Sequence, residues 1–101
     1  MNTDLRLLRS LIAVVDCGTV VGAARARGYS TSAVSRQLGV LQRRLGLQLF
    51  LRHGRCITPT PAAIALTERA RELVDTADQF ERYLTNLADV ALRAETPVGV
   101  E

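Results

Sequence analysis

The feature that most constrains the fold is an apolar repeat that fills the last third of the chain. From residue 63 to residue 91, apolar residues recur at alternating spacings of three and four, which is an unbroken heptad pattern. The other positions are mostly charged or polar, so residues 61–93 are expected to form one long amphipathic helix beginning at Pro61. The repeat consists of Ala63, Leu66, Ala70, Leu73, Ala77, Phe80, Leu84, Leu87 and Ala91.

Such a helix has more apolar length than the rest of the chain can cover. The 101 residues leave room for one small domain beside it. Packing of the stripe on the chain's own domain is one reading, and pairing with a second copy is the other and the favoured one. The residues expected at this dimer interface are Leu66, Ala70, Leu73, Ala77, Phe80, Leu84 and Leu87.

The first part of the chain predicts two short helices separated by glycine. In the first, Thr3 is a candidate N-cap and Gly18 a C-terminal stop. In the second, Thr19 is the expected cap and Gly28 the stop. The apolar stripe expected to face the core from the first helix contains Leu5, Leu8, Leu11, Ile12 and Val15.

A third helix is expected after Gly28, with Ser30 as its N-cap. Its buried face is predicted from apolar residues at i, i+4, i+7 and i+11, which are Val34, Leu38, Leu41 and Leu45. The preceding helix carries the pair Ala23-Ala24, whose small side chains allow close helix packing. Two helices joined across a glycine in this way are typical of a helix-turn-helix. Gly39 inside the third helix has no firm explanation beyond close packing.

A small β-hairpin is predicted next, because apolar and polar residues alternate from Leu47 to Leu51 and His53-Gly54 is a turn signal. Cys56 to Thr58 then return as a second short strand, and Pro59 ends it. The hairpin would act as a wing that carries Arg52 and Arg55 at its tip. The expected fold is therefore mainly α: a winged helix-turn-helix of three helices and a hairpin, followed by a long dimerising helix.

Charge is divided unequally along the chain, and all thirteen cationic side chains are arginines. Residues 1–61 carry nine arginines and two aspartates, a net +7, whereas residues 62–101 have a net −4. The basic part is expected to meet an anion and the acidic part to stay away from it. In a helix-turn-helix the N-terminal end of the second helix meets base edges in the major groove, where short hydroxyls can donate and accept. The expected contacts with double-stranded DNA are Thr31, Ser32, Ser35, Arg36, Gln37, Arg43, Arg52, His53 and Arg55.

Residues 4–93 resemble the winged helix-turn-helix and linker helix of LysR-type transcriptional regulators. The resemblance implies a bacterial, cytoplasmic, sequence-specific transcription regulator that binds an inverted-repeat operator as a dimer through antiparallel linker helices. It also implies a tetramer in the full-length protein and a small-molecule effector bound by a C-terminal domain that is absent from this chain. The matching positions are Ala23-Ala24, Ser30, Ala33-Val34-Ser35, Leu41, Leu45-Gly46, Leu49-Phe50, Arg52, Arg55 and Thr60-Pro61-Ala62.

The domain boundaries that follow are residues 1–60 for the DNA-binding domain, 61–93 for the linker helix and 94–101 for the start of a hinge. Two positions depart from the family in ways that bear on function. Thr31 stands where a longer amide side chain is common, so base preference is not carried over from the family. Arg27 replaces a core-like residue, so atypical packing between the second and third helices is expected.

Other classes of function have little support in the sequence. No apolar run is long enough for a membrane span, and the N-terminus does not have the pattern of a signal peptide. Cys17 and Cys56 are expected to be free thiols, and the single histidine, His53, has no neighbours at ligand spacing, so no metal or other cofactor is expected. No base stands beside a nucleophile, so an enzyme is not expected.

Two rival functions remain open. Beside the LysR-type regulator, the first alternative is a helical adaptor that dimerises through residues 63–91 and binds an acidic protein, and the second is a winged-helix regulator of a different family. Salt dependence and sequence preference of DNA binding separate a DNA-binding protein from the adaptor.

Overall fold

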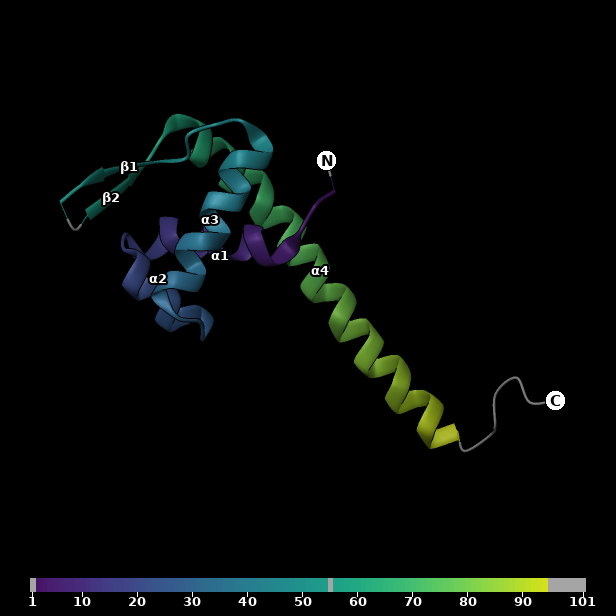
Figure 1. Cartoon of the computed structure of the whole chain (residues 1–101). Coiled ribbons are helices and arrows are strands. Elements are labelled where there is room, and N and C mark those ends of the chain that lie inside the picture. Colours follow the sequence, from purple (N-terminus) through teal and green to yellow (C-terminus); the bar gives the residue numbers. More distant parts are fainter. Residues whose placement is uncertain (1, 55, 95–101) are drawn as a thin grey trace.

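Four helices and one hairpin make up the part of the chain that the structure describes, residues 2–54 and 56–94 of a computed structural model. The elements are α1 (Leu5–Cys17), α2 (Val20–Arg27), α3 (Thr31–Leu45), β1 (Phe50–His53), β2 (Cys56–Pro59) and α4 (Pro61–Ala94). The strands pair antiparallel, with Phe50 opposite Pro59 and His53 opposite Cys56. Figure 1 shows α1, α2 and α3 gathered together, the hairpin projecting on one side, and α4 extending far beyond them on the other. The predicted architecture is confirmed.

Capping side chains determine where the helices begin. Thr19 accepts a hydrogen bond from the Gly22 amide at 3.0 Å, and Ser30 accepts one from the Ala33 amide at 3.1 Å, as predicted. The prediction for α1 was wrong by one residue, because Asp4 and not Thr3 is the N-cap. The Asp4 carboxylate accepts from the Arg6 amide at 2.9 Å. A carboxylate at this position also interacts favourably with the positive end of the helix dipole.

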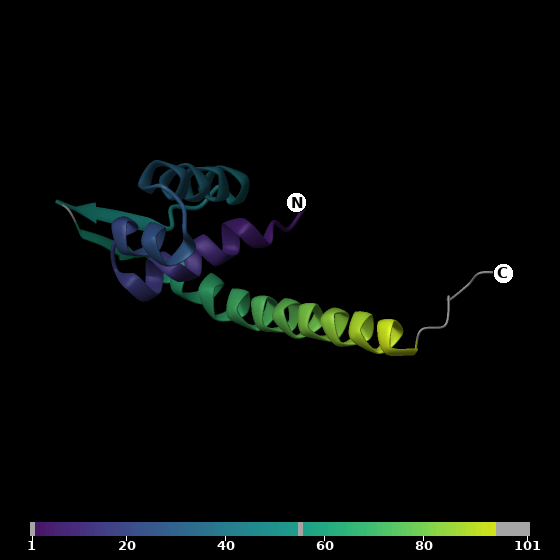
Figure 2. The ribbon, with the colours of Figure 1, turned by 90° about the horizontal axis from the view of Figure 1, so that it is seen from below.

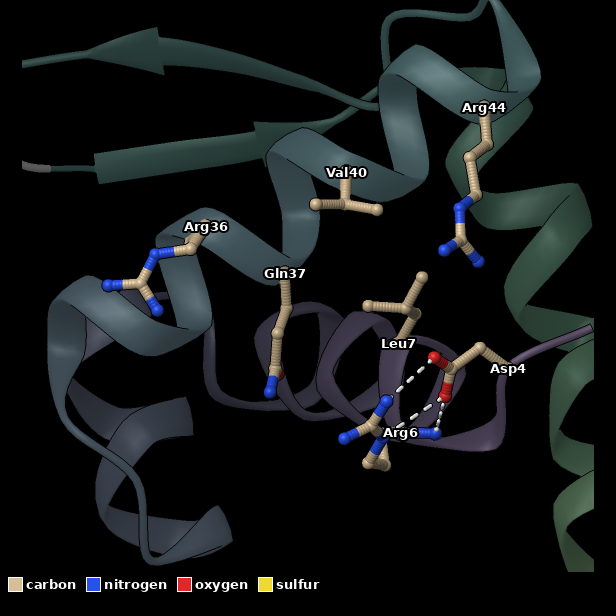
Figure 3. A pocket seen from close by; sticks show the side chains of 7 residues that line it. All are labelled: Asp4, Arg6, Leu7, Arg36, Gln37, Val40 and Arg44. Atoms are coloured by element: carbon tan, nitrogen blue, oxygen red, sulfur yellow. Dashed lines mark hydrogen bonds and ion pairs between the residues drawn. The ribbon is translucent and has the colours of Figure 1, made fainter.

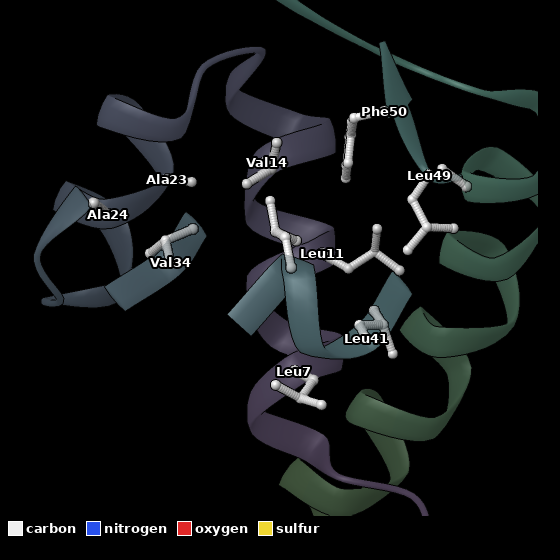
Figure 4. Packing of buried hydrophobic residues seen from close by; sticks show 11 residues of the cluster. Leu7, Leu11, Val14, Ala23, Ala24, Val34, Leu41, Leu49 and Phe50 are labelled. Atoms are coloured by element: carbon white, nitrogen blue, oxygen red, sulfur yellow. The ribbon is translucent and has the colours of Figure 1, made fainter. Parts of the chain in front are cut away.

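The main core lies where α1, α2 and α3 meet. Leu11 is fully buried at its centre, and Ala23 and Ala24 allow α2 to pack closely against the neighbouring helices (Figure 4). Leu49 closes the core from the segment that leads into β1, which ties the hairpin to the helices. The buried members are Leu7, Leu11, Val14, Ala23, Ala24, Val34, Leu38, Leu41, Leu49, Phe50 and Ala63.

A second cluster joins α1 to α4. It changes the expectation of which neighbours cover the apolar faces of these two helices. Leu8 of α1 packs against Ala70 and Val74 of α4, with Leu5 and Ile12 at the edge. The single stripe predicted for α1 is therefore two faces, one toward α2 and α3 and the other toward α4. Figure 2 shows α1 lying beside the first part of α4.

Part of the apolar stripe expected at the dimer interface is covered within the chain itself. Ala70 is only 3% exposed because Leu8 of the same chain covers it, and Leu66 packs against the main core. Of the two alternatives for the apolar stripe, packing on the chain's own domain therefore applies to the beginning of α4. Further along, Leu73, Phe80, Leu84 and Leu87 are exposed. The apolar stripe that α4 leaves uncovered starts at Leu73.

Two ion pairs hold α1 and α4 antiparallel. Arg9 donates to Asp78 at 2.8 Å, and Arg71 donates to Asp16 through two hydrogen bonds, one of 3.1 Å. These hydrogen bonds lower the pKa of both aspartates. The two pairs lie at opposite ends of the contact, so α4 is fixed to the domain as far as Asp78. Residues 79–94 extend beyond it by about 24 Å at 1.5 Å per residue.

The lowered pKa values predict an acid-sensitive contact between α1 and α4. A carboxylate whose pKa is lower in the folded state adds stability above its unfolded pKa, near 4, and loses it as pH falls through the folded value. We expect the thermal midpoint to fall more steeply between pH 5 and pH 3 in the wild-type chain than in a variant carrying Arg9→Ala and Arg71→Ala. Melting curves at several pH values test this. Parallel pH profiles would show that the pairs add nothing to stability.

Candidate nucleic-acid interface

The N-terminal end of α3 is open to solvent and carries short hydroxyl side chains. Thr31 and Ser32 are exposed and Ser35 is half-buried. No acidic residue lies in the first turn of α3, so nothing of opposite charge offsets the positive end of the helix dipole there. The backbone of the connection is fixed, because the Tyr29 amide donates to the Ala24 carbonyl at 3.0 Å. Such a helix end is suited to bind an anion or the edges of bases.

The wing lies beside this end of α3. Arg52 and His53 are exposed on β1, with Gly54 at the turn. Arg52 lines a hollow of about 470 Å³ together with Thr31 and Ser35, so the wing and the start of α3 share one open surface. Arg55, also expected to contact DNA, lies outside the described residues.

The arginines of α3 and β1 differ from several of those on α1 and α4 in their partners. Among the described residues, the ion pairs use arginines of α1 and α4 only. None of these pairs includes Arg36, Arg43, Arg44 or Arg52, and all four are exposed. The positive charge on α3 and β1 is therefore available to a ligand.

One predicted contact is used inside the domain. The Gln37 amide oxygen accepts a hydrogen bond from the hydroxyl of Ser10, a fully buried residue of α1. Figure 3 shows Gln37 pointing from α3 toward α1, whereas Arg36, one residue earlier, points away. Gln37 therefore serves the packing of α3 on α1, and the expectation that it contacts DNA does not fit this arrangement.

A pocket of about 230 Å³ lies between the start of α1 and the middle of α3, and Figure 3 shows the side chains that line it. Its charged lining includes Arg6, Arg36 and Arg44, but Arg6 is engaged by Asp4 at 3.2 Å. The hydrogen bond from Arg6 lowers the pKa of the Asp4 carboxyl. The pocket therefore holds its own carboxylate and is less suited to an anion than the open surface beside the wing.

A polar network that sequence reasoning missed joins the three helices. Arg27 donates to the Ser10 hydroxyl at 3.3 Å, and its guanidinium lies 4.8 Å from the centre of the Tyr29 ring. The Ser10 hydroxyl in turn donates a hydrogen bond to the Gln37 side chain of α3. Arg27 stands where the family has a core-like residue, and this difference predicted unusual packing here. A second sign in the sequence was Ser10, a polar residue between Leu7 and Leu11 on the buried face of α1. The network helps to fix α3 relative to α1 and α2.

Metal binding, thiols and membrane crossing are the other properties on which the described residues can be compared with the sequence. No cluster of three or more histidine, cysteine or acidic side chains among them is placed to hold a metal ion. Cys17 and Cys56 are exposed free thiols. None of the helices described is both long enough and apolar enough to cross a membrane.

Comparison with known proteins agrees with this geometry. Residues 5–64 match the family model described as bacterial regulatory helix-turn-helix protein, lysR family. The chain belongs to the LysR family. Among its curated relatives, it is 42% identical over 72 residues to the HTH-type transcriptional regulator AbaB of Streptomyces antibioticus, a match that covers 71% of this chain and 24% of AbaB. It is 41% identical to the transcriptional activator BauR of Pseudomonas aeruginosa, over 96% of this chain and 32% of BauR. The chain thus spans about a quarter to a third of these curated relatives.

Solved structures show the same fold. The crystal structure of a CbnR_DBD–DNA complex superposes with a TM-score of 0.76 at 30% identity, covering 85% of this chain and 99% of the other. The oxidized form of Corynebacterium glutamicum OxyR gives a TM-score of 0.83 at 27% identity, over 87% of this chain and 27% of OxyR. These solved structures therefore share the winged helix-turn-helix and long helix of this chain over most of its length.

Proposed function

We propose that this chain is the DNA-binding region of a cytoplasmic, sequence-specific transcription regulator. The observation that carries the proposal is the exposed start of α3, where hydroxyls and unpaired arginines lie beside the wing. Membership of a family of bacterial regulators supports it, as does the likeness to a domain crystallised with DNA. Binding, and not catalysis, is the proposed activity.

Two kinds of contact follow from where the side chains lie. Thr31, Ser32, Ser35 and Arg36 are proposed to read base edges in the major groove, because they occupy the exposed start of α3. Arg43, Arg52 and His53 are proposed to contact phosphates or the minor groove, with Arg55 added from sequence alone. Phosphate contacts position the protein, whereas base contacts specify the site.

We further propose that two chains pair through the uncovered stripe of α4. The proposed interface contains Leu73, Ala77, Phe80, Leu84 and Leu87, shorter than expected because the first turns of α4 pack on their own domain. Antiparallel pairing would place one wing domain at each end and would favour an inverted-repeat site.

Residues 1–60 would bind DNA and residues 61–93 would dimerise. The proposed hinge, residues 94–101, lies almost wholly outside the described residues. In the whole protein, a tetramer and a small-molecule effector site in a further domain remain proposals from the family.

The decisive experiment is selection of bound DNA from a random library. We expect two half-sites related by an inverted repeat, and an affinity that falls steeply with salt. A helical adaptor for an acidic protein would select no motif. Half-sites in direct repeat would contradict the antiparallel dimer.

Thr31 provides a test of base reading. Thr31→Gln lengthens an exposed side chain at the start of α3 without touching the core, so folding should be unaffected. We expect the preferred base at one position of each half-site to change, because an amide can bond in a bidentate manner to adenine. Selected motifs and melting curves of both proteins measure this. Identical motifs would show that residue 31 does not read bases.

A further inference from the structure

Gly39 has no role that the fold itself requires. It lies in the middle of α3, where glycine is less favourable than alanine. It is not among the glycines with positive φ. A Cβ atom at this position would meet only the end of the Arg43 side chain, at 3.4 Å. By contrast, a Cβ at Gly22 would lie 3.0 Å from the Thr19 hydroxyl, so packing explains that glycine.

Gly39 lies on the floor of a groove between α3 and the wing. Ser35, Gly39 and Arg52 line a central hollow of about 110 Å³. Ser35 and Arg52 also line the hollow of about 470 Å³ toward the start of α3. Gly39 also lines a hollow of about 360 Å³ toward Arg43. The shared residues make these hollows one continuous surface, which we call the α3–wing groove.

The charge of the α3–wing groove favours an anionic ligand. Arg43 lies near one end and Arg52 is shared by the centre and the other end. None of the residues that line the three hollows is acidic. Gly39 itself contributes no side chain to the floor, and the nearest atom to its open position is the end of the flexible Arg43 side chain, so a ligand there can approach the helix backbone closely.

We propose that Gly39 is the point at which a strand of bound DNA, passing between α3 and the wing, comes closest to the backbone of α3. The inference rests on the proposed function. A helix in the major groove and a wing in the adjacent minor groove must lie on either side of the strand that separates the two grooves. That strand therefore passes between α3 and the hairpin. Glycine at position 39 accommodates it at the expense of helix stability.

Gly39→Ala tests this with effects of opposite sign. The thermal midpoint should rise by about 4 to 8 °C, because alanine favours the helix and meets no obstacle in the free domain. The dissociation constant for the selected DNA site should rise about tenfold, since the added methyl group moves the strand away from its phosphate contacts. The selected motif should stay the same, because backbone contacts carry no base information.

Thr85→Ala is the matched control. Thr85 is exposed on α4, outside the proposed dimer stripe, and alanine there also favours the helix. It should raise the thermal midpoint and leave DNA affinity unchanged. Sedimentation of both variants checks that the oligomeric state is the same.

The outcomes separate the two levels of the argument. Wild-type protein that binds no DNA would refute the proposed function itself. If the wild-type protein binds the selected DNA and Gly39→Ala binds it with the same dissociation constant, the close approach at Gly39 is refuted while the proposed function stands. A lower thermal midpoint of Gly39→Ala would show that the fold requires this glycine, and an altered motif would place bases, not backbone, against it. Either result would overturn the proposal.

Discussion

Phe80→Asp combined with Leu84→Asp should convert the proposed dimer into a monomer. Both side chains are large, apolar and exposed, 57% and 41% respectively, on the part of α4 beyond its contact with α1. Burying four carboxylates in a two-chain seam is strongly unfavourable unless each is paired. The substituted residues touch nothing in the main core, so each wing domain should keep its fold.

Sedimentation at micromolar concentration measures the change, and circular dichroism verifies the fold. Gln79→Asp with Asn86→Asp is the control, since it adds the same charge to exposed polar positions outside the stripe and should leave the dimer intact. The monomer should bind a two-half-site DNA about 10² to 10⁴ times more weakly, because the second half-site no longer gains from effective concentration. A dimer that persists would place the interface elsewhere.

Arg36→Ala should reduce affinity for the selected site by about 1–3 kcal/mol and remove base preference at one position of each half-site. Arg36 is exposed one turn into α3, and no carboxylate among the described residues pairs with it. Its planar guanidinium can donate two hydrogen bonds to guanine O6 and N7.

Arg52→Ala is the comparison that separates base reading from charge. Arg52 lies on the wing, so its loss should weaken all sequences evenly and reduce the salt slope by about one. Binding to the selected site and to scrambled DNA, over a range of salt concentrations, gives both quantities. If Arg36→Ala leaves the selected motif unchanged, the placement of α3 in the major groove is wrong.

Most element boundaries were predictable because they depend on local chemistry. Thr19 and Ser30 each cap a helix through an amide three residues away, and Pro61 begins α4, so the signal and the structure lie in the same short segment. The error at Asp4 has the same local origin, since two neighbouring residues can both cap a helix.

Contacts between elements were harder to predict from the sequence. Periodicity shows that a face is apolar but not which neighbour covers it. The heptad at Ala70 therefore looked available to a second chain, although Leu8 covers it. From the sequence, Gln37 was expected to be as available to DNA as its neighbour Arg36. Only the packing of α1 on α3 shows that Gln37 instead bonds to Ser10. In the candidate interface, the serines and arginines were predictable from the motif, whereas the role of Gly39 required the groove around it.

The two ion pairs between α1 and α4 couple the orientation of the DNA-binding domain to the direction of the long helix. Arg9–Asp78 and Arg71–Asp16 join α4 to α1 at both ends of their contact, which favours movement of the domain together with this part of the helix. Across the roughly 24 Å from Asp78 to the end of α4, a tilt of about 10° shifts one end relative to the other by about 4 Å, more than the roughly 3.4 Å that one base-pair step advances along the DNA helix axis. Small changes in the angle between paired helices would therefore change which spacing of half-sites both domains can engage together.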